Sequence, residues 1–391
     1  MSEAIIWGVR LSPYTLKLEA ALQYKGIAYR RLPAMGTHFE NARIILRLEA
    51  AKRRKEVSRY PDMDKELDEY PLLPYFSHDK RFFEYDSSSI LRRMEQEGEG
   101  RNIIPSPPLF NFLTHFIDEA FNEFGLYLVH HMRWVGSTKS NRMGKLLASE
   151  FKNALPPGGA WLLSRSFPAR QVKRLPYLMS VAPKGYKAGV RASLIPPTKE
   201  DFPPTHELLE QSWKAILEAL DAIFRRQNYI FGDHFSLTDA SIYGQLGMNL
   251  VDPEAADKIK QIAPNLFAWL KRIDEGQFME TSNYVNENLI FNEKLSTLMN
   301  ILMGTYAALM VQNERAHNDA VANGKHRFNE QGFDLGENIY TGKLRGYAFK
   351  SVVKSFQVRS WREVKEHWKG LAPSDREILT EQIQLTELLD Y

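Results

Sequence analysis

Two serines in this chain stand where helices are expected to begin, and a hydroxyl at such a place can serve two purposes. Ser12 precedes Pro13, a residue that suits the first helical position, and Ser87 follows Asp86. The exposed amide groups and the positive end of a helix attract anions, so each serine either caps its helix or holds an anionic ligand group. Ser12 and the Asp86–Ser87 pair are therefore candidate sites for an anionic ligand group, with capping as the alternative.

The rest of the composition limits the kinds of reaction and binding site that the chain can have. The sequence contains no cysteine, which excludes disulfides, cysteine metal ligands and a protein thiol nucleophile. The adjacent His130 and His131 would point in different directions on a helix, and no further ligand stands at a convincing spacing, so we predict no metal site. Lys and Arg number 51 against 48 Asp and Glu, and this net charge of +3 does not favour a nucleic-acid-binding protein.

The overall composition is that of a folded protein with more than one domain. The chain has 391 residues, of which 43% are hydrophobic and 12% aromatic. Its start lacks a basic segment followed by a long apolar core, and no apolar run approaches the roughly 20 residues of a spanning helix. We expect a cytoplasmic protein that does not associate with a membrane.

The first hundred residues alternate between strand and helix patterns. A strand at 4–7, a helix that begins at Ser12 and ends at Gly26, and a strand at 27–32 come first. A charged and mainly helical stretch follows at 38–69, then two strands at 72–76 and 81–85, and a third helix that opens at Asp86. Glycines and prolines near 97–108 indicate a domain boundary.

The rest of the chain is predicted to be almost wholly helical. Helices are expected at 109–134, 209–224, 295–311, 347–368 and 374–389, and 154–205 is expected to be a long irregular insertion. Ser236 and Asp239 have the spacing of a capping box ahead of an apolar helix.

The order of these pieces resembles the glutathione transferase superfamily. SPYTLK at 12–17 is similar to the family's active-site turn, and Leu73-Pro74 to its cis-proline. DSSSI at 86–90 is similar to its acid-Ser signature, GDHFSLTD at 232–239 to its folding motif, and PNLFAW at 264–269 to the helix that follows. The resemblance implies a thioredoxin-like α/β domain at 1–100 followed by an all-helical domain at 106–283, with a helical extension at 284–391. It also implies a homodimer.

The resemblance also implies a glutathione site in the first domain. Ser12 would donate a hydrogen bond to the glutathione sulfur. This bond would favour the thiolate over the thiol, and a free thiol has a pKa of roughly 8.5. The backbone of Leu73, turned outward by a cis bond to Pro74, would pair with the cysteinyl backbone of glutathione. Ser87 would hold the γ-glutamyl carboxylate, and Asp86 would face the ammonium group.

A second substrate would lie beside glutathione. We expect a small electrophilic molecule in a pocket to which Tyr14, Thr15 and His115 contribute. The distance from Ser12 to Pro74 exceeds the family norm by about twenty residues, and the surplus lies in 38–69, from which we name no binding residue. Nor does the sequence identify the electrophile.

These observations favour a glutathione-dependent transferase of the serine type, or a related glutathione-dependent lyase. The thiolate would attack an electrophilic carbon, with conjugation, dehalogenation or ether cleavage as outcomes. The alternative is a non-catalytic ligand carrier or assembly scaffold, which the enlarged segments 38–69 and 284–391 favour. The set of Ser12, Pro74, Asp86 and Ser87 favours the enzyme.

Overall fold

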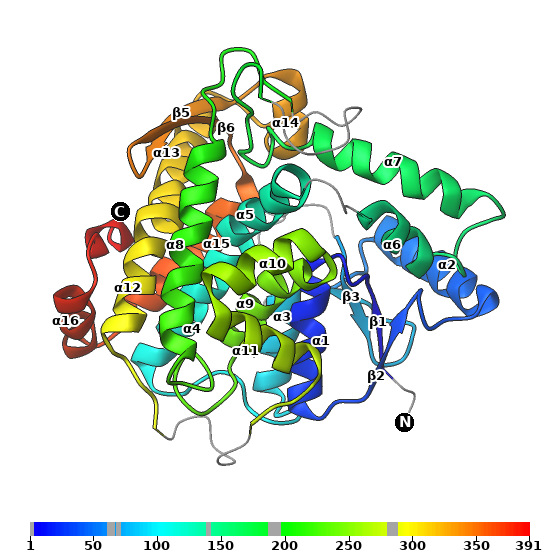
Figure 1. Cartoon of the computed structure of the whole chain (residues 1–391), viewed down its shortest axis with the longest axis horizontal. Helices are drawn as coiled ribbons and strands as arrows, with labels where there is room; N and C mark the ends of the chain where they lie inside the picture. The colour runs from blue at the N-terminus through cyan, green and yellow to red at the C-terminus, as the bar shows by residue number, and fades with distance from the viewer. Residues whose placement is uncertain (1–3, 61–66, 68–71, 138–141, 187–196, 280–287) are drawn as a thin grey trace.

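The N-terminal part of the chain is a four-stranded sheet covered by helices on both faces (Figure 1). The computed structural model describes residues 4–60, 67, 72–137, 142–186, 197–279 and 288–391. In chain order the elements are β1 (Ala4–Trp7), α1 (Pro13–Lys25), β2 (Tyr29–Leu32), α2 (His38–Arg54), β3 (Tyr75–Ser77), β4 (Glu84–Tyr85) and α3 (Ser87–Gln96). The strand order is β2-β1-β3-β4, with β1 parallel to β2 and antiparallel to β3. This is the thioredoxin-like arrangement that the sequence predicts.

All four residues of β1 are buried because the strand is covered on both sides. Side chains alternate along a strand, so Ala4 and Ile6 join the core beneath α1 and α3. Ile5 and Trp7 belong to a second cluster with residues of α2. The start of α1 is thereby fixed against the end of β1, where the candidate Ser12 lies.

The second part is a body of helices. Residues 108–136 form one continuous rod, made of α4 (Pro108–Ala120) and α5 (Leu126–His131) with a π-helical turn after each. The helix predicted at 109–134 is confirmed. The body also contains α8 (His206–Phe224), α9 (Leu237–Gly247), α10 (Pro253–Ile262) and α11 (Pro264–Asp274). The predicted capping box of Ser236 and Asp239 is present at the start of α9.

The expected irregular insertion at 154–205 is only partly irregular. It contains a helix, α7 (Gly159–Lys173). This helix packs on α6 (Met143–Glu150), which precedes the insertion, and the pair lies beside α2 (Figure 1). In α7 the sequence has a proline and few buried apolar positions, so its periodicity gives little signal. Residues 187–196 of the expected insertion lie outside the described residues.

The C-terminal segment contains a hairpin as well as helices. Its elements are α12 (Glu293–Leu302), α13 (Ala308–Ala322), α14 (Asn329–Leu335), β5 (Ile339–Leu344), β6 (Tyr347–Val352), α15 (Ser355–Lys369) and α16 (Pro373–Gln382). The helix predicted at 347–368 is wrong over its first part, where β6 pairs with β5. Arg345 and Gly346 take φ values of +48° and +85°, as a two-residue hairpin turn requires. The helix predicted at 374–389 ends at Gln382, before a short 3₁₀ turn at Thr386–Leu389.

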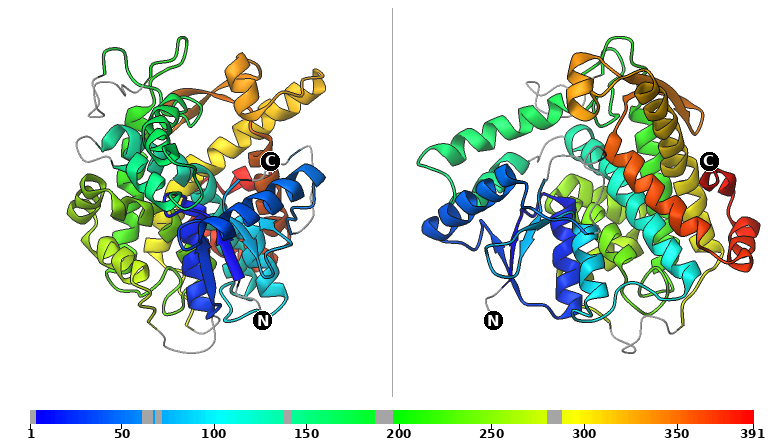
Figure 2. Two further views of the ribbon diagram at one scale, coloured as in Figure 1. Left: turned by 90° about the vertical axis from the view of Figure 1, so that its right-hand side faces the viewer. Right: turned by 180° about the vertical axis from the view of Figure 1, so that it is seen from behind.

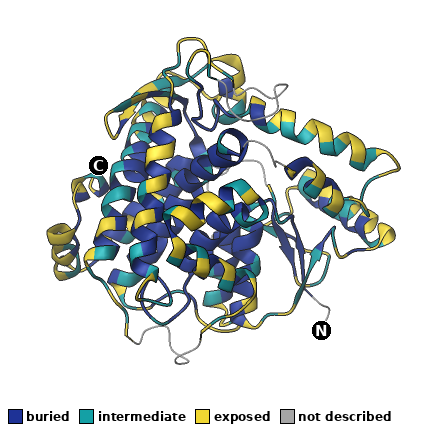
Figure 3. Cartoon of the chain, viewed as in Figure 1, coloured by how far each residue is buried: buried dark blue, intermediate teal, exposed yellow. Residues whose placement is uncertain are grey.

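The C-terminal segment shares one core with the rest of the molecule. Helix α15 packs against α4 (Figure 2), and the ring of Trp368 lies 5.4 Å from that of Phe112 between centroids. Figure 3 shows the continuous buried interior. Among the described residues, Glu293–Ala322 is long and apolar enough to cross a membrane, yet 67% of its most apolar window is buried inside the protein.

Candidate functional site

A cavity of about 140 Å³ lies where the loop before β3, the start of α3, the helical rod and α15 meet. Its lining comes from both ends of the chain: Tyr14, Leu72, Leu73, Pro74, Tyr85, Asp86, Ser87, Glu119, Asn122, Glu123, Phe356 and Arg359. Five of the residues predicted from the sequence, Tyr14, Leu73, Pro74, Asp86 and Ser87, are therefore brought together. A larger hollow of about 440 Å³ lies near Pro108 and His367, but no predicted site residue lines it.

The loop before β3 forms one wall of the cavity. The bond between Leu73 and Pro74 is cis, as predicted. Pro74 is buried and Leu73 is half-buried, and both line the cavity. The pairing of the Leu73 backbone with a ligand remains a prediction.

The N-terminus of α3 forms the next wall, and Asp86 caps it. Oδ1 of Asp86 accepts hydrogen bonds from the amides of Ser88 at 3.1 Å and Ser89 at 3.3 Å. Its Oδ2 accepts a hydrogen bond of 2.8 Å from Nε of Arg59. Burial favours the neutral acid, but the charge and hydrogen bond of Arg59 outweigh burial and lower the pKa of Asp86. The carboxylate is thus ionised and already engaged, while Ser87, 3% exposed, lines the cavity beside it.

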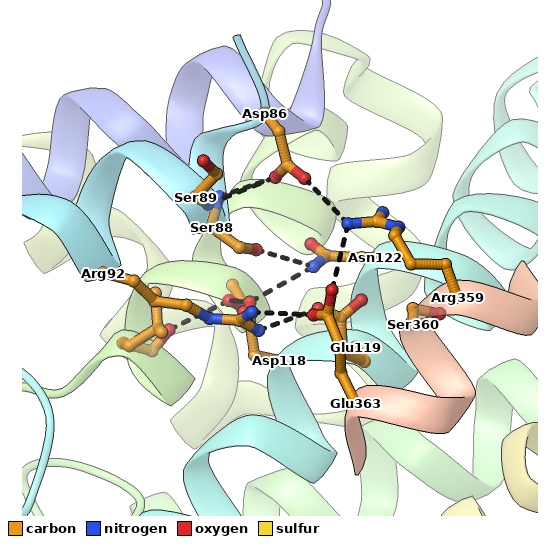
Figure 4. A network of polar contacts seen from close by, with 12 residues as sticks. Asp86, Ser88, Ser89, Arg92, Asp118, Glu119, Asn122, Arg359, Ser360 and Glu363 are labelled. Carbon is orange, nitrogen blue, oxygen red and sulfur yellow. Dashed lines mark hydrogen bonds and ion pairs between the residues drawn. The ribbon is translucent and has the colours of Figure 1, made fainter. Parts of the chain in front are cut away.

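Charges of opposite sign alternate behind this wall (Figure 4). Arg92 forms ion pairs of 3.0 Å with Glu119 and with Glu363 of α15. Glu363 also lies 3.5 Å from Arg59. Burial raises the pKa of Glu119 to about 7, against the attraction of Arg92. The Glu119 carboxyl therefore gains and loses its proton near neutral pH.

Ser12 caps α1 in the structure. Its Oγ accepts a hydrogen bond of 3.3 Å from the amide of Thr15, and it is not among the residues that line the cavity. Tyr14 does line the cavity, and its hydroxyl donates to the backbone oxygen of Asn122 at 2.7 Å. A hydroxyl that caps a helix can still make another hydrogen bond. The Ser12 oxygen accepts from the amide of Thr15, and its own O–H can donate to a further group. Its role toward a sulfur remains a prediction.

Two residues expected in a substrate pocket lie elsewhere. Thr15 is fully buried and does not line the cavity. His115 lies in the interface between α4 and α15, where its ring stacks on His367 with centroids 3.9 Å apart. Burial, with Arg92 nearby, lowers the pKa of His115 well below its ordinary value. The reason is that α15 covers the face of α4 on which His115 lies.

A buried lysine connects the first domain to the helical rod. Nζ of Lys17 donates to the carboxylate of Asp118 and, at 2.6 Å, to the hydroxyl of Ser88. Ser241 of α9 also donates to Asp118. Lys17 and Asp118 are 1% and 0% exposed, so the pair is shielded from water. This cluster fixes α1 and α3 against the wall that carries Glu119 and Glu123.

The two adjacent histidines have separate partners. His130 interacts with Gln171 through Nε2 at 3.1 Å, and His131 with Ser180 through Nδ1 at 2.8 Å. Within the part of the chain that the structure describes, no group of three or more His, Asp or Glu side chains is arranged to hold a metal ion.

Several cavity residues were missed by sequence analysis. The helical rod did contain a sequence signal for the cavity. Polar side chains recur in an otherwise apolar helix at Glu119, Asn122 and Glu123. Phe356 and Arg359 lie in a stretch that mixes aromatic and basic residues, which fits an anion-covering segment, but its pattern is also that of an ordinary amphipathic helix, so neither residue could be singled out. Arg59 belongs to the segment 38–69 from which no binding residue was named.

One family model matches the chain. Residues 203–272 match the model described as "Glutathione S-transferase, C-terminal domain". This range contains α8, α9, α10 and most of α11. No curated protein sequence matches the chain.

Several solved structures are similar to this one at low sequence identity. A glutathione transferase from Phanerochaete chrysosporium is 15% identical, with a TM-score of 0.42 over 72% of this chain and 100% of that one. The beta-etherase LigF from Sphingobium sp. strain SYK-6 is 16% identical, with a TM-score of 0.39 over 69% and 94%. A glutathione S-transferase from Ceriporiopsis subvermispora in complex with glutathione is 17% identical, with a TM-score of 0.41 over 72% and 100%.

Proposed function

We propose that this chain, whose residues 203–272 match the C-terminal domain of the glutathione S-transferases, is a glutathione-dependent transferase, or a related lyase, of the serine type. One observation carries this proposal. The cis Leu73–Pro74 bond and the helix start at Asp86–Ser87, two motifs predicted independently from the sequence, line the same cavity.

The residues of the cavity suit the ends of a glutathione molecule. The backbone of Leu73 offers an amide and a carbonyl to the peptide part, as an extended strand would. The Ser87 hydroxyl at the N-terminus of α3 suits a carboxylate. Glu119 and Glu123 place negative charge where an ammonium group would be attracted.

In the proposed reaction, Ser12 donates a hydrogen bond to the glutathione sulfur. The bond and the nearby N-terminus of α1 stabilise the thiolate over the thiol. The thiolate attacks an electrophilic carbon of a small molecule, and the leaving group departs with the bonding electrons. The protein contributes proximity and thiolate stabilisation without a covalent protein intermediate. A homodimer and a cytoplasmic location remain expectations.

A second candidate function is that of a non-catalytic ligand carrier or scaffold. It is favoured by the position of Ser12, which caps α1 and does not line the cavity. It is also favoured by the small size of the cavity, about 140 Å³, compared with the roughly 300 Å³ or more of typical ligand sites.

Calorimetry with glutathione tests the proposal. We expect saturable binding that Ser87→Ala weakens about tenfold or more, as the loss of a hydrogen bond to a charged group predicts. Ser149→Ala, which alters an exposed serine of α6, serves as the control. An absence of binding at millimolar glutathione would overturn the enzymatic proposal and leave the carrier or scaffold.

A further inference from the structure

Helix α15 forms one wall of the cavity and contributes the cationic side chain of Arg359 to its lining. Phe356 and Arg359 stand three positions apart on this helix, on the same face, and both line the cavity. They come from the C-terminal segment, whereas the other lining residues lie between Tyr14 and Glu123. The site is therefore composite, and its last wall comes from an element beyond the matched C-terminal domain.

The guanidinium of Arg359 is largely enclosed, yet its contacts with neighbouring carboxylates are long. Its Nη1 lies 3.5 Å from Oδ2 of Asp86 and 3.6 Å from Oε1 of Glu363, while its side chain is only 13% exposed. Both distances exceed the 2.7–3.2 Å of an ordinary hydrogen bond. Its Nε is buried and has no hydrogen-bond partner among the described residues. Arg359 thus retains donors for a further acceptor (Figure 4).

Asp86 does not need Arg359 as a partner. Arg59 binds the same carboxylate at 2.8 Å, and the amides of Ser88 and Ser89 bind its other oxygen. Asp86 therefore keeps close partners when Arg359 binds another acceptor, and the second carboxylate near Arg359, that of Glu363, lies 3.6 Å from its Nη1. Glu119 and Glu123, from the helical rod, supply negative charge to the same cavity, and Glu119 is also paired with Arg92 at 3.0 Å.

This separation of charges matches an α-amino acid group. Its carboxylate would lie between the Ser87 hydroxyl and the guanidinium, and its ammonium would face the two glutamates. Arginine presents a planar set of donors that fits a carboxylate. Phe356 adds an apolar surface to the same cavity, and charge interactions are stronger beside apolar groups than in open water.

We propose that Arg359 of α15 is the residue that binds the α-carboxylate of the γ-glutamyl group, so that the C-terminal segment determines specificity for this end of the ligand. The proposal rests on the proposed function, because it takes glutathione as the ligand. It assigns to Arg359 a binding role and to Glu363 a positioning role, since Glu363 holds α15 to Arg92 at 3.0 Å.

Calorimetry with three ligands and two variants tests the proposal. The ligands are glutathione, γ-aminobutyryl-cysteinyl-glycine, which lacks the α-carboxylate, and glutaryl-cysteinyl-glycine, which lacks the α-amino group. The variants are Arg359→Ala and, as a matched control on the same helix, Arg362→Ala, whose arginine is 44% exposed and pairs with Glu314. Circular dichroism and thermal unfolding establish that each variant is folded.

We expect Arg359→Ala to weaken glutathione and the deamino ligand about tenfold or more, and to leave the decarboxylated ligand unchanged. Arg362→Ala should alter none of them. Equal losses for all three ligands, or none, would overturn the role of Arg359. If Arg359→Ala fails to fold, the wild-type protein still tests the proposal, because equal affinity for glutathione and the decarboxylated ligand contradicts a carboxylate site. A wild-type protein that binds no glutathione refutes the proposed function itself.

Discussion

Nε of Arg59 lies 2.8 Å from Oδ2 of Asp86, and this ion pair joins the irregular segment after α2 to the start of α3. The Arg59 side chain is 2% exposed. The backbone next to it is held as well, because the amide of Ser58 donates to the oxygen of Phe83 at 3.0 Å. The pair fixes the helix end on which the candidate ligand site depends.

Removing Arg59 should destabilise the protein strongly. Arg59→Met would leave the partly buried Asp86 with Arg359 as its nearest cation, beside the amides of Ser88 and Ser89, and breaking a buried ion pair on one side costs about 3–5 kcal/mol. Urea unfolding measures this cost. Arg54→Met, at an exposed arginine of α2, provides the control. A change of less than about 1 kcal/mol for Arg59→Met would show that the pair contributes little.

Ligand affinity should depend on pH through Glu119. The pKa of this carboxyl is raised to about 7, so it is neutral below that pH and ionised above it. Only the ionised form attracts an ammonium group, so affinity should rise between about pH 6 and pH 7.5. S-methylglutathione is the suitable ligand, because it has no titrating thiol. Glu119→Gln should abolish the dependence, and a flat profile for the wild-type protein would contradict the assignment.

Ser12 can be tested separately as a cap and as a thiolate donor. Ser12→Ala removes both functions, whereas Ser12→Gly removes the hydroxyl but costs the helix only a few tenths of a kcal/mol. If the hydroxyl stabilises the thiolate, both variants should raise the pKa of bound glutathione by about one unit or more, measured by thiolate absorbance. Ser12→Ala alone should lower stability, by about 1 kcal/mol. An unchanged thiol pKa in both variants would reduce Ser12 to a cap.

Lys17 and Asp118 should show strong energetic coupling. Either Lys17→Met or Asp118→Asn leaves a buried polar group without its main partner, and each should cost about 3–5 kcal/mol. The double variant should cost less than the sum, because the two residues are in direct contact. A double-mutant cycle in urea measures the difference. Additive costs would show that the pair does not connect α1 to α4 energetically.

The C-terminal segment should be required for folding. Deleting residues 288–391 would uncover Phe112 and Phe116, whose rings lie 5.4 Å from Trp368 and 5.5 Å from Tyr306 between centroids. Burial of each such side chain contributes about 1.5–3 kcal/mol. We expect the shortened chain to aggregate or to lose cooperative unfolding, measured by gel filtration and calorimetry. A monodisperse, cooperatively unfolding product would contradict this.

The sequence predicted best those features that are determined locally. The helix start at Ser12 and the capping box at Ser236 depend on neighbours within a few positions, and both are found. The hairpin of β5 and β6 was missed, because its aromatic and basic residues also fit a helical period. The dipeptide Arg345-Gly346 was the available signal for a turn.

The missed part of the site depends on contacts between distant positions. Arg59 and Arg359 approach Asp86 from 27 and 273 positions away. No spacing rule connects such residues, since their meeting depends on the packing of α15 against α4. Leu73, Pro74 and Ser87 could be named from the sequence only because each belongs to a recognisable local motif.

The origin of the last cavity wall in α15 has a consequence for how the protein is made. A ribosome extends the chain from its N-terminus, and N-terminal domains fold first during synthesis. Every other wall of the cavity is encoded before residue 124, whereas Phe356 and Arg359 are synthesised much later. A nascent chain therefore carries an open, incomplete site until α15 has been synthesised. The cavity is complete only once α15 packs against α4.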